Sequence, residues 1–391
     1  MRCLKYFTLY SMFVLVSILC STHLVYAQTA PSGPDTNTIV KAKVIQVISI
    51  SQETVPYSNT PSPVQTLRAQ ILEGAQKDQV VVFSNDYTQL NSGDFFYLSA
   101  TVTSTGVESY SVSDPDRLPI LSFFLIVFLL LVLLFGGIQG LRGLLSLAGS
   151  LLLITYVLLP AIIHGISPLL VSIVVSSLII ILGSYITHGF NKTTSSAVVG
   201  MIITVIITGF MAFYGVHASH LTGITGDETA YLSSTIAGGI NMIGLLMGGI
   251  MIGLLGILYD VSIGQAISVE ELYHVAPHLG RWKIYKRAIR MGREHIGALV
   301  NMLAIAYVGA SLPLLLIFYP QQGTSLLLTI NNEIFTTEIL RTLIGSIGLV
   351  LAVPITTLFA VYIIIRIPKR KPSEEILKEE EKLLAHVEHH H

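Results

Sequence analysis

The sequence predicts an α-helical integral membrane bundle of about seven spans, with a signal peptide or N-terminal membrane helix and then an extracytoplasmic, small β-barrel-like (OB-like) domain before it. Three observations lead to this fold class. The 391-residue chain has a mean hydropathy of +0.71, with 52% hydrophobic and 12% charged residues, which excludes an ordinary soluble domain. Long apolar runs recur after residue 118, and alternating β-type runs precede them.

Residues 1–27 have the pattern of a secretory signal. Arg2 and Lys5 precede an apolar stretch, and the small residue Ala27 offers a cleavage site. The alternative is an uncleaved membrane helix, and either interpretation places residues 28–118 outside the cytoplasm. The two cysteines, Cys3 and Cys20, fall in this segment, so cleavage would remove every disulfide or thiolate metal ligand.

Residues 28–118 contain five β-rich runs that turn signals separate, such as Asn91-Ser92-Gly93-Asp94. The runs are Ile39–Ile50, Thr66–Glu73, Gln79–Ser84, Phe95–Thr103 and Val107–Val112. Five short strands in so few residues predict a small closed barrel, because closure removes exposed strand edges. Cations and aligned aromatic residues are few, so we expect no nucleic-acid partner.

Residues 119–367 form the predicted membrane domain, in which each apolar run is near the roughly 20 residues that a spanning helix needs. The runs are Pro119–Ile138, Leu144–Ile163, Ser167–Thr187, Ser195–Val216, Ala237–Tyr259, Ile296–Tyr319 and Leu343–Ile365.

The charged residues predict the orientation of these spans. Between Leu118 and Leu340 the chain has eight Lys or Arg residues, and all of them fall in alternate connections. Because cytoplasmic loops retain Lys and Arg, the C-terminus and the charged tail of residues 368–391 are expected in the cytoplasm. Arg117 and Arg341 fall outside, and each has acidic neighbours that offset its charge. The last histidines resemble a purification tag and carry no functional argument.

The fifth span is rich in glycine. Gly244 with Gly248, and Gly249 with Gly253, are small-xxx-small pairs that let a neighbouring helix approach closely. Two interpretations stay open: tight helix packing, or a locally unwound helix that lines a substrate path.

The connection between the fifth and sixth spans predicts an amphipathic helix on an anionic membrane surface. Its cations recur at three- and four-residue spacing: Lys283, Lys286, Arg287, Arg290 and Arg293. We expect this helix to anchor the loop to the lipid bilayer.

Polar residues in and beside the fifth and sixth spans form a candidate solute or ion path, because an unpaired polar group in a span costs a few kcal/mol. They are Asp260, Ser262, Gln265, Glu294, Asn301 and Tyr307. Asp260 is expected to approach Arg293 or Glu294. Pro313 is expected to kink the sixth span, and Pro160 and Pro354 offer similar breaks. The alternative is an interfacial salt bridge with an interhelical amide bond.

Motifs for catalysis or for cofactors are absent from the sequence. We find no Walker loop, no G-x-S-x-G elbow and no H-E-x-x-H, so we expect neither an enzyme nor a cofactor. His217, His220 and Asp227 share one connection, but His-x-x-His without a third fixed ligand is only a weak zinc candidate, so no metal site is expected.

Four segments of the chain resemble the YibE/F-like family of bacterial multi-pass membrane proteins: Gly256–Ile263, Met291–Gly297, Asn301–Leu303 and Ala306–Pro313. The layout of an extracytoplasmic β domain followed by membrane helices is also similar to that family. The resemblance implies a membrane protein that moves a solute, with signature positions at Asp260, Ser262, Gly292, Arg293, Asn301, Tyr307, Gly309 and Pro313.

These observations lead to one functional expectation and one alternative. We expect a secondary transporter or channel for a small solute or ion in the bacterial cell membrane. The alternative is a non-transporting envelope scaffold or accessory protein whose β domain binds an extracytoplasmic partner. The glycine face and the charged tail are compatible with a homo-oligomer, and a single copy is large enough to act alone.

Overall fold

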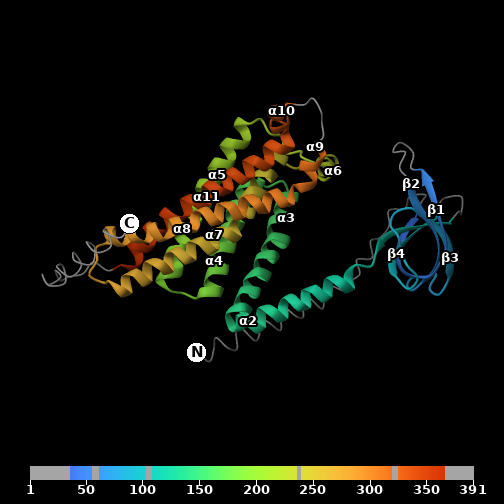
Figure 1. Cartoon of the computed structure of the whole chain (residues 1–391), viewed down its shortest axis with the longest axis horizontal. Helices are drawn as coiled ribbons and strands as arrows, with labels where there is room; N and C mark the ends of the chain where they lie inside the picture. The colour runs from blue at the N-terminus through green and yellow to red at the C-terminus, as the bar shows by residue number, and fades with distance from the viewer. Residues whose placement is uncertain (1–35, 55–60, 103–107, 236–238, 319–324, 366–391) are drawn as a thin grey trace. The chain divides into compact units, whose positions relative to one another are not determined.

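The computed structural model describes residues 36–54, 61–102, 108–235, 239–318 and 325–365 (Figure 1). The predicted signal peptide and the charged tail lie outside the described residues. The chain divides near Leu129 into two compact units. The first holds the β-strands and the start of the first long helix, and the second holds the remaining helices.

The first unit contains one antiparallel sheet in the strand order β3-β2-β1-β4-β5. Its strands are β1 (Thr36–Thr54), β2 (Pro61–Ile71), β3 (Val80–Asn85), β4 (Phe95–Val102) and β5 (Glu108–Pro115). All five predicted strands are therefore present. Side chains alternate between the two faces of a strand, so Val44 of β1 and its partner Ala69 of β2 both point into the core. Phe96 and Leu98 of β4 are fully buried in the same core.

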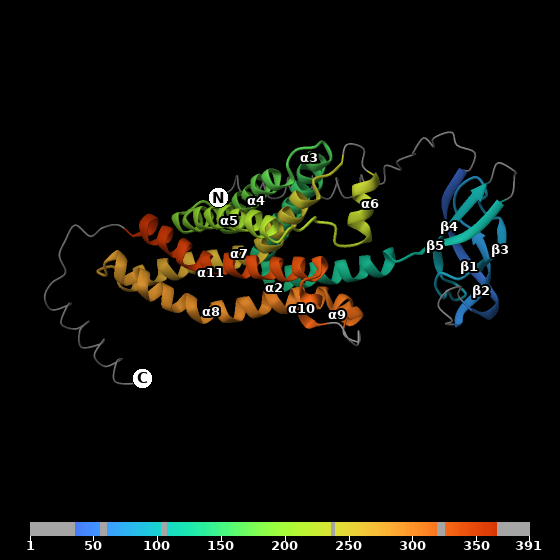
Figure 2. The same cartoon turned by 90° about the horizontal axis from the view of Figure 1, so that it is seen from above.

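The sheet curves into a half-barrel (Figure 2). β1 pairs with β2 along its second part and with β4 along its first part, and its register with β2 shifts near Gln46 and Val47. Such bulges bend a strand and increase its twist. In the described strands no ladder joins β3 to β5, so these two remain the edges and the predicted barrel is not closed by hydrogen bonds.

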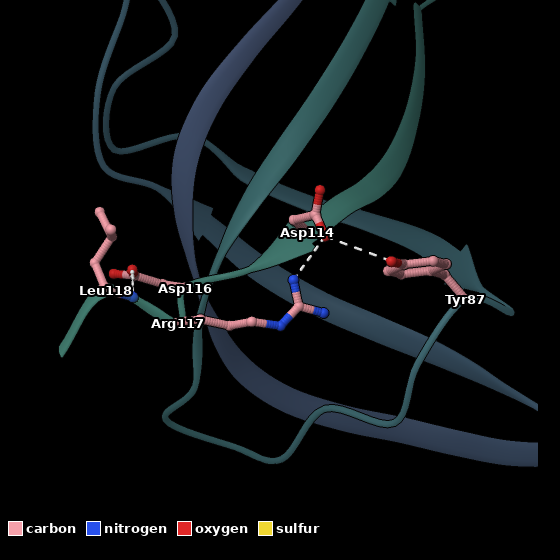
Figure 3. Close-up of polar contacts among 5 residues, drawn as sticks. All are labelled: Tyr87, Asp114, Asp116, Arg117 and Leu118. Carbon is pink, nitrogen blue, oxygen red and sulfur yellow. Dashed lines mark hydrogen bonds and ion pairs between the residues drawn. The ribbon is translucent and has the colours of Figure 1, made fainter. Parts of the chain in front are cut away.

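Ionic contacts fix the junction between β5 and the first long helix (Figure 3). The Arg117 guanidinium lies 2.9 Å from Asp114 Oδ1, which also accepts a hydrogen bond from the Tyr87 hydroxyl at 3.4 Å. Asp116 Oδ1 accepts the backbone N–H of Leu118 at the start of that helix, at 3.2 Å. The prediction that acidic neighbours offset the charge of Arg117 is therefore confirmed.

A buried ion pair supports the same junction. Lys41 Nζ of β1 lies 2.7 Å from Asp116 Oδ2, and the Asp116 side chain is only 2% exposed. The hydrogen bond from Lys41 lowers the pKa of Asp116, and the same hydrogen bond raises the pKa of Lys41.

The helices that follow include one π-helical turn. They are α2 (Leu118–Leu153), η1 (Ile154–Leu158), α3 (Leu159–Ile163), α4 (Pro168–His188), α5 (Lys192–Ala218), α6 (Asp227–Thr235), α7 (Met242–Val275), α8 (Arg281–Ala310), α9 (Leu312–Phe318), α10 (Leu326–Ile330) and α11 (Glu333–Ile364).

Five helical stretches of the described chain are long and apolar enough to cross a membrane. The third, fourth, fifth and seventh predicted spans overlap α4, α5, α7 and α11 over most of their described residues. The first two predicted spans share the stretch Leu118–Ile163, which Gly137 interrupts with a left-handed φ of 53°. The sixth span is not among the five, because the first half of α8 is charged and the helix ends at Ala310.

Of the three prolines expected to break a span, Pro313 lies at a break between helices, Pro160 follows a π-helical turn without a break, and Pro354 lies inside a helix. The chain leaves α8 at Ser311, and Pro313 lies in the first turn of α9, as the sequence predicts. The π-helical turn η1 comes just before Pro160. Pro354, by contrast, lies inside the continuous helix α11, so the predicted break there is absent.

Small residues bring the helices of the second unit together. α5 and α11 pack where Gly200 meets Thr356, and a Cβ on Gly200 would lie 2.8 Å from the Thr356 Cα atom. Gly348 of α11 faces Thr208 of α5 and Leu254 of α7. Close approach at glycine is the usual mode of packing in membrane bundles. α7 contacts α4, α5, α8 and α11, so its side chains have neighbours on several faces.

Candidate functional site

The second unit contains a cavity between α7 and α8, which we call the α7–α8 cavity. Its volume is about 290 Å³, and Val353 of α11 forms one wall. Its lining residues are Asp260, Val261, Gly264, Gln265, Ser268, Met291, Gly292, His295, Leu299 and Val353. Two residues of the predicted path, Asp260 and Gln265, therefore lie at the same cavity.

Gln265 ties three helices together at this cavity. Its side chain is 5% exposed, and its Nε2 donates to the Ala288 carbonyl of α8 and to Thr357 Oγ1 of α11, each at 2.8 Å. The Thr357 hydroxyl donates in turn to the Val353 carbonyl at 2.6 Å. Buried polar groups need partners, and these bonds satisfy both hydrogens of the amide.

Glycine makes room for this arrangement. A Cβ on Gly292 would lie 2.6 Å from Val353 Cγ1 and 2.8 Å from Gln265 Oε1. Any side chain there would push α8 away from α7 and α11. The signature position Gly292 therefore has a steric explanation. Gly264 differs, because its missing Cβ would meet no heavy atom within 4 Å in the described structure.

Asp260 lies at the exposed edge of the cavity. The neighbouring Tyr259 donates its hydroxyl hydrogen to the Gly183 carbonyl of α4 at 3.1 Å, which anchors α7 to α4 beside the cavity. Within the described ranges no Lys or Arg, Arg293 included, forms an ion pair with Asp260. The expected approach of Asp260 to Arg293 or Glu294 stays a prediction.

The remaining residues of the predicted path do not join the cavity. Ser262 is fully buried, and its hydroxyl has no partner in the described part of the chain. Glu294 and Asn301 are exposed on α8 and are not among the lining residues. Tyr307 lies further along α8, with its hydroxyl 2.7 Å from where a Cβ of Gly253 would be.

Sequence reasoning left Ser268 and His295 out of the path, although both line the cavity. Ser268 lies beyond the apolar run that defined the fifth span, because α7 continues as a helix to Val275. The sequence does contain a pattern that identifies His295. Residues 292, 295 and 299 recur at three- and four-residue spacing, which places them on one face of a helix.

The glycine pairs of α7 face different neighbours. A Cβ on Gly244 would lie 3.0 Å from Pro168 of α4, and one on Gly248 would collide with Ser172 Oγ. Gly249 has open space around it in the described structure, and Gly253 faces Tyr307 of α8. α7 is continuous from Met242 to Val275, so the glycine-rich stretch is not locally unwound.

The predicted amphipathic helix is the first half of α8. Ile284, Ala288 and Gly292 form its buried face. Trp282 stacks on Tyr285 with centroids 5.3 Å apart, and Lys286 lies over the Trp282 ring. The other cations of the prediction, Lys283, Arg287, Arg290 and Arg293, follow along the same half of the helix.

Arg281 joins the start of α8 to the end of α11. Its Nη2 donates to the carbonyls of Ile365 at 3.0 Å and Tyr362 at 3.3 Å, which a helix C-terminus otherwise leaves without partners. This contact holds the end of the α7–α8 hairpin against α11.

The residues of the weak zinc candidate do not form a metal site in the described structure. His217 contacts the Phe213 carbonyl through Nδ1 at 2.8 Å, and Asp227 begins α6. Over the ranges that the structure describes, no three His, Cys, Asp or Glu side chains lie close enough to hold a metal ion, including His217, His220 and Asp227.

Comparison with known proteins gives one match. A family model described as YibE/F-like protein matches residues 124–366, a range that includes every residue of the α7–α8 cavity. No curated protein and no solved structure matches the chain.

Proposed function

The chain belongs to the YibE/F-like family, and we propose that it is a secondary transporter or channel for a small solute or ion in the bacterial cell membrane. The α7–α8 cavity, with the carboxylate of Asp260 at its edge and no described Lys or Arg paired with it, is the observation that carries this proposal. Ionisable groups in or beside membrane spans commonly mark the path of an ion or a substrate.

The proposed path runs between α7 and α8. Gly249, Gly253, Gly256 and Gly264 share a face of α7 with Asp260, at spacings of three and four residues. These glycines present no side chains, and in the described structure only Tyr307 comes within 4 Å of where a Cβ of any of them would lie, so this face of α7 is open. Its end at Asp260 and Gly264 lines the cavity.

The membrane arrangement of this proposal follows the charged residues. The α7–α8 hairpin carries six cations between Arg281 and Arg293, so we place it and the cavity at the cytoplasmic side. The basic half of α8 then faces the headgroups of anionic lipids. The first and sixth apolar runs complete a seven-span domain, and the partly open five-stranded sheet acts as an OB-like extracytoplasmic domain.

Flux measurements in proteoliposomes test the proposal. The purified full chain is screened with protons, alkali and divalent cations, halides and phosphate. Asp260→Asn should reduce the flux of the transported solute by about tenfold or more, because it removes the charge from the path. Glu294→Gln is the matched control, since it neutralises an exposed carboxylate that lies off the cavity. Equal flux in both variants would exclude Asp260 from the path.

A scaffold remains the second candidate, because the β domain exposes apolar side chains. Ile39 and Ile50 of β1 are 60% and 61% exposed, and Val80 and Val82 of β3 are about half exposed. Exposed apolar surface of this kind often marks a protein-binding site. A protein that copurifies with the full chain, and is lost on Ile50→Lys, would support this role if no solute in the panel moves.

A further inference from the structure

We propose that the α7–α8 cavity binds a monovalent cation, which the carboxylate of Asp260 and the amide oxygen of Gln265 hold. This inference rests on the proposed function, since it names the class of solute that the same cavity would take. The cation is an alkali ion, either Na⁺ or K⁺.

The orientation of the Gln265 amide is fixed by its partners. The Ala288 carbonyl can only accept a hydrogen bond, so the Gln265 nitrogen must face it. The Thr357 hydroxyl has already given its hydrogen to the Val353 carbonyl, so it too accepts from Gln265. Both amide hydrogens are therefore used, and Oε1 points the other way.

Gln265 Oε1 remains as a free acceptor at the cavity. It lies 2.8 Å from where a Cβ of Gly292 would be, and both residues line the cavity. In the described structure no group donates a hydrogen bond to this oxygen. An amide oxygen that lines a cavity and has no donor from the described chain is available as a ligand for a cation.

The charge of the lining residues favours a monovalent cation. Asp260 is the one carboxylate among the described residues that line the cavity, and none of the described cations pairs with it there. Gln265 and Ser268 add neutral oxygens. Hard cations prefer oxygen ligands, and divalent ions usually take more than one carboxylate. One negative charge matches one positive charge.

The cavity also has the room that an ion requires. Its volume of about 290 Å³ holds an alkali ion with part of its water shell. The Ser268 hydroxyl donates to the Gly264 carbonyl at 2.9 Å, so its oxygen stays available as an acceptor. Gly264 has no heavy atom within 4 Å of its missing Cβ, as far as the chain is described, so nothing fills this side.

Cation binding to the purified full chain tests the inference. NaCl or KCl replaces N-methylglucamine chloride at constant ionic strength, so that general screening does not change. A ligand that binds only the folded state raises the unfolding temperature in a saturable way. Trp282, the single tryptophan of the chain, reports unfolding by its fluorescence. The measurement is made near pH 8, where imidazole side chains are generally uncharged.

We expect Asp260→Asn to weaken the apparent affinity for the cation by about tenfold or more, because it removes the one carboxylate among the described residues that line the cavity. Glu294→Gln should leave the affinity unchanged. Gly264→Leu provides a second test, because leucine favours the helix and its side chain would enter the empty space. It should abolish cation binding, whereas Gly297→Leu, in open space on α8, should not.

The outcomes separate this inference from the proposed function. Stabilisation by Na⁺ or K⁺ that disappears in Asp260→Asn and Gly264→Leu supports the cation site. No stabilisation, or the same stabilisation in Asp260→Asn, overturns the cation site, even if liposomes show Asp260-dependent flux of another solute. Saturable cation binding in a protein without flux would support the site and contradict transport.

Discussion

The β domain and the α7–α8 hairpin each contain a carboxylate of interest, and the two carboxylates differ in their ionic partners. Asp116 is almost fully buried, and it has Lys41 at 2.7 Å and the N–H of Leu118 as partners. Asp260 lines a cavity, and none of the described cations pairs with it. A buried charge with its partners is a structural contact, whereas an unpaired one in a cavity is a candidate for function.

The two regions also differ in how they pack. The β domain fills its core with large side chains such as Phe96, Leu67 and Ile71. The bundle brings helices together at Gly200, Gly248 and Gly292, where no side chain intervenes. Truncation of a core residue is therefore the damaging change in the sheet, and enlargement of a glycine is the damaging change in the bundle.

The largest effect should come from Gly292→Val. The added atoms would collide with Val353 and with Gln265, which together hold α7, α8 and α11. Overpacking of this kind costs about 1–3 kcal/mol or more of unfolding free energy. Thermal unfolding in detergent measures it. Gly297→Ala on the same helix meets nothing within 4 Å in the described structure, and it should be neutral or stabilising. Equal stability of the two variants would contradict close packing at Gly292.

A smaller effect is expected from neighbouring glycines of α7. Gly248→Ala places its Cβ against Ser172 of α4, and should cost about 1 kcal/mol or more of unfolding free energy. Gly249→Ala, one residue along, points into open space and should gain up to about 1 kcal/mol from helix propensity. Unfolding curves of the two variants, compared with the parent chain, check both signs. Identical shifts would mean that α7 does not pack on α4 through Gly248.

How much the sequence predicts depends on how local the interaction is. Alternation within a strand is local, so all five strands could be predicted, but the half-barrel depends on the bulges of β1 and on edges far apart in sequence. The apolar runs likewise located four helices. Gly137 separates two helices within the stretch Leu118–Ile163, close to the predicted end of the first span at Ile138, but the sequence did not show which residue makes the kink, because a left-handed φ is a property of the fold.

The candidate site was predicted in part for a similar reason. Asp260 and Gln265 come close together in the sequence at the end of the fifth apolar run, so both could be assigned to one helix, but a five-residue spacing turns them about 140° apart around its axis. The side of α8 that meets them depends on packing between helices. One residue turns a helix by about 100°, and His295 lines the cavity whereas the exposed Glu294 does not.

The paired and unpaired carboxylates can be compared directly by substitution. Lys41→Met removes the partner of Asp116 and leaves a buried carboxylate, so we expect a lower unfolding temperature for the β domain. Asp260→Asn removes no pair and should leave the unfolding temperature of the bundle unchanged in buffer without alkali cations. Calorimetry of the two full-length variants measures both unfolding temperatures. A destabilised Asp260→Asn would show that Asp260 has a structural partner.

The smallest expected effect is the contribution of Asp116 to the pH dependence of the unfolding free energy. It is small because the other carboxylates of the chain also contribute to that dependence. The Asp116 pKa lies below its ordinary value through its bond with Lys41, so its stabilisation is complete above about pH 4 and is lost as the pH falls through the lowered pKa.

Lys41 has the opposite sign. Its raised pKa keeps its contribution complete below about pH 10, and the contribution is lost as the pH rises through that pKa. Calorimetry from acid to alkaline pH should therefore show a β-domain unfolding temperature that is constant near neutral pH and decreases in acid. Lys41→Met should make this decrease smaller. Asp260→Asn should leave that transition unchanged at every pH, because the unpaired carboxylate is in the other unit. An acid dependence that survives Lys41→Met in full would mean that other carboxylates, and not the Asp116 pair, govern the β domain.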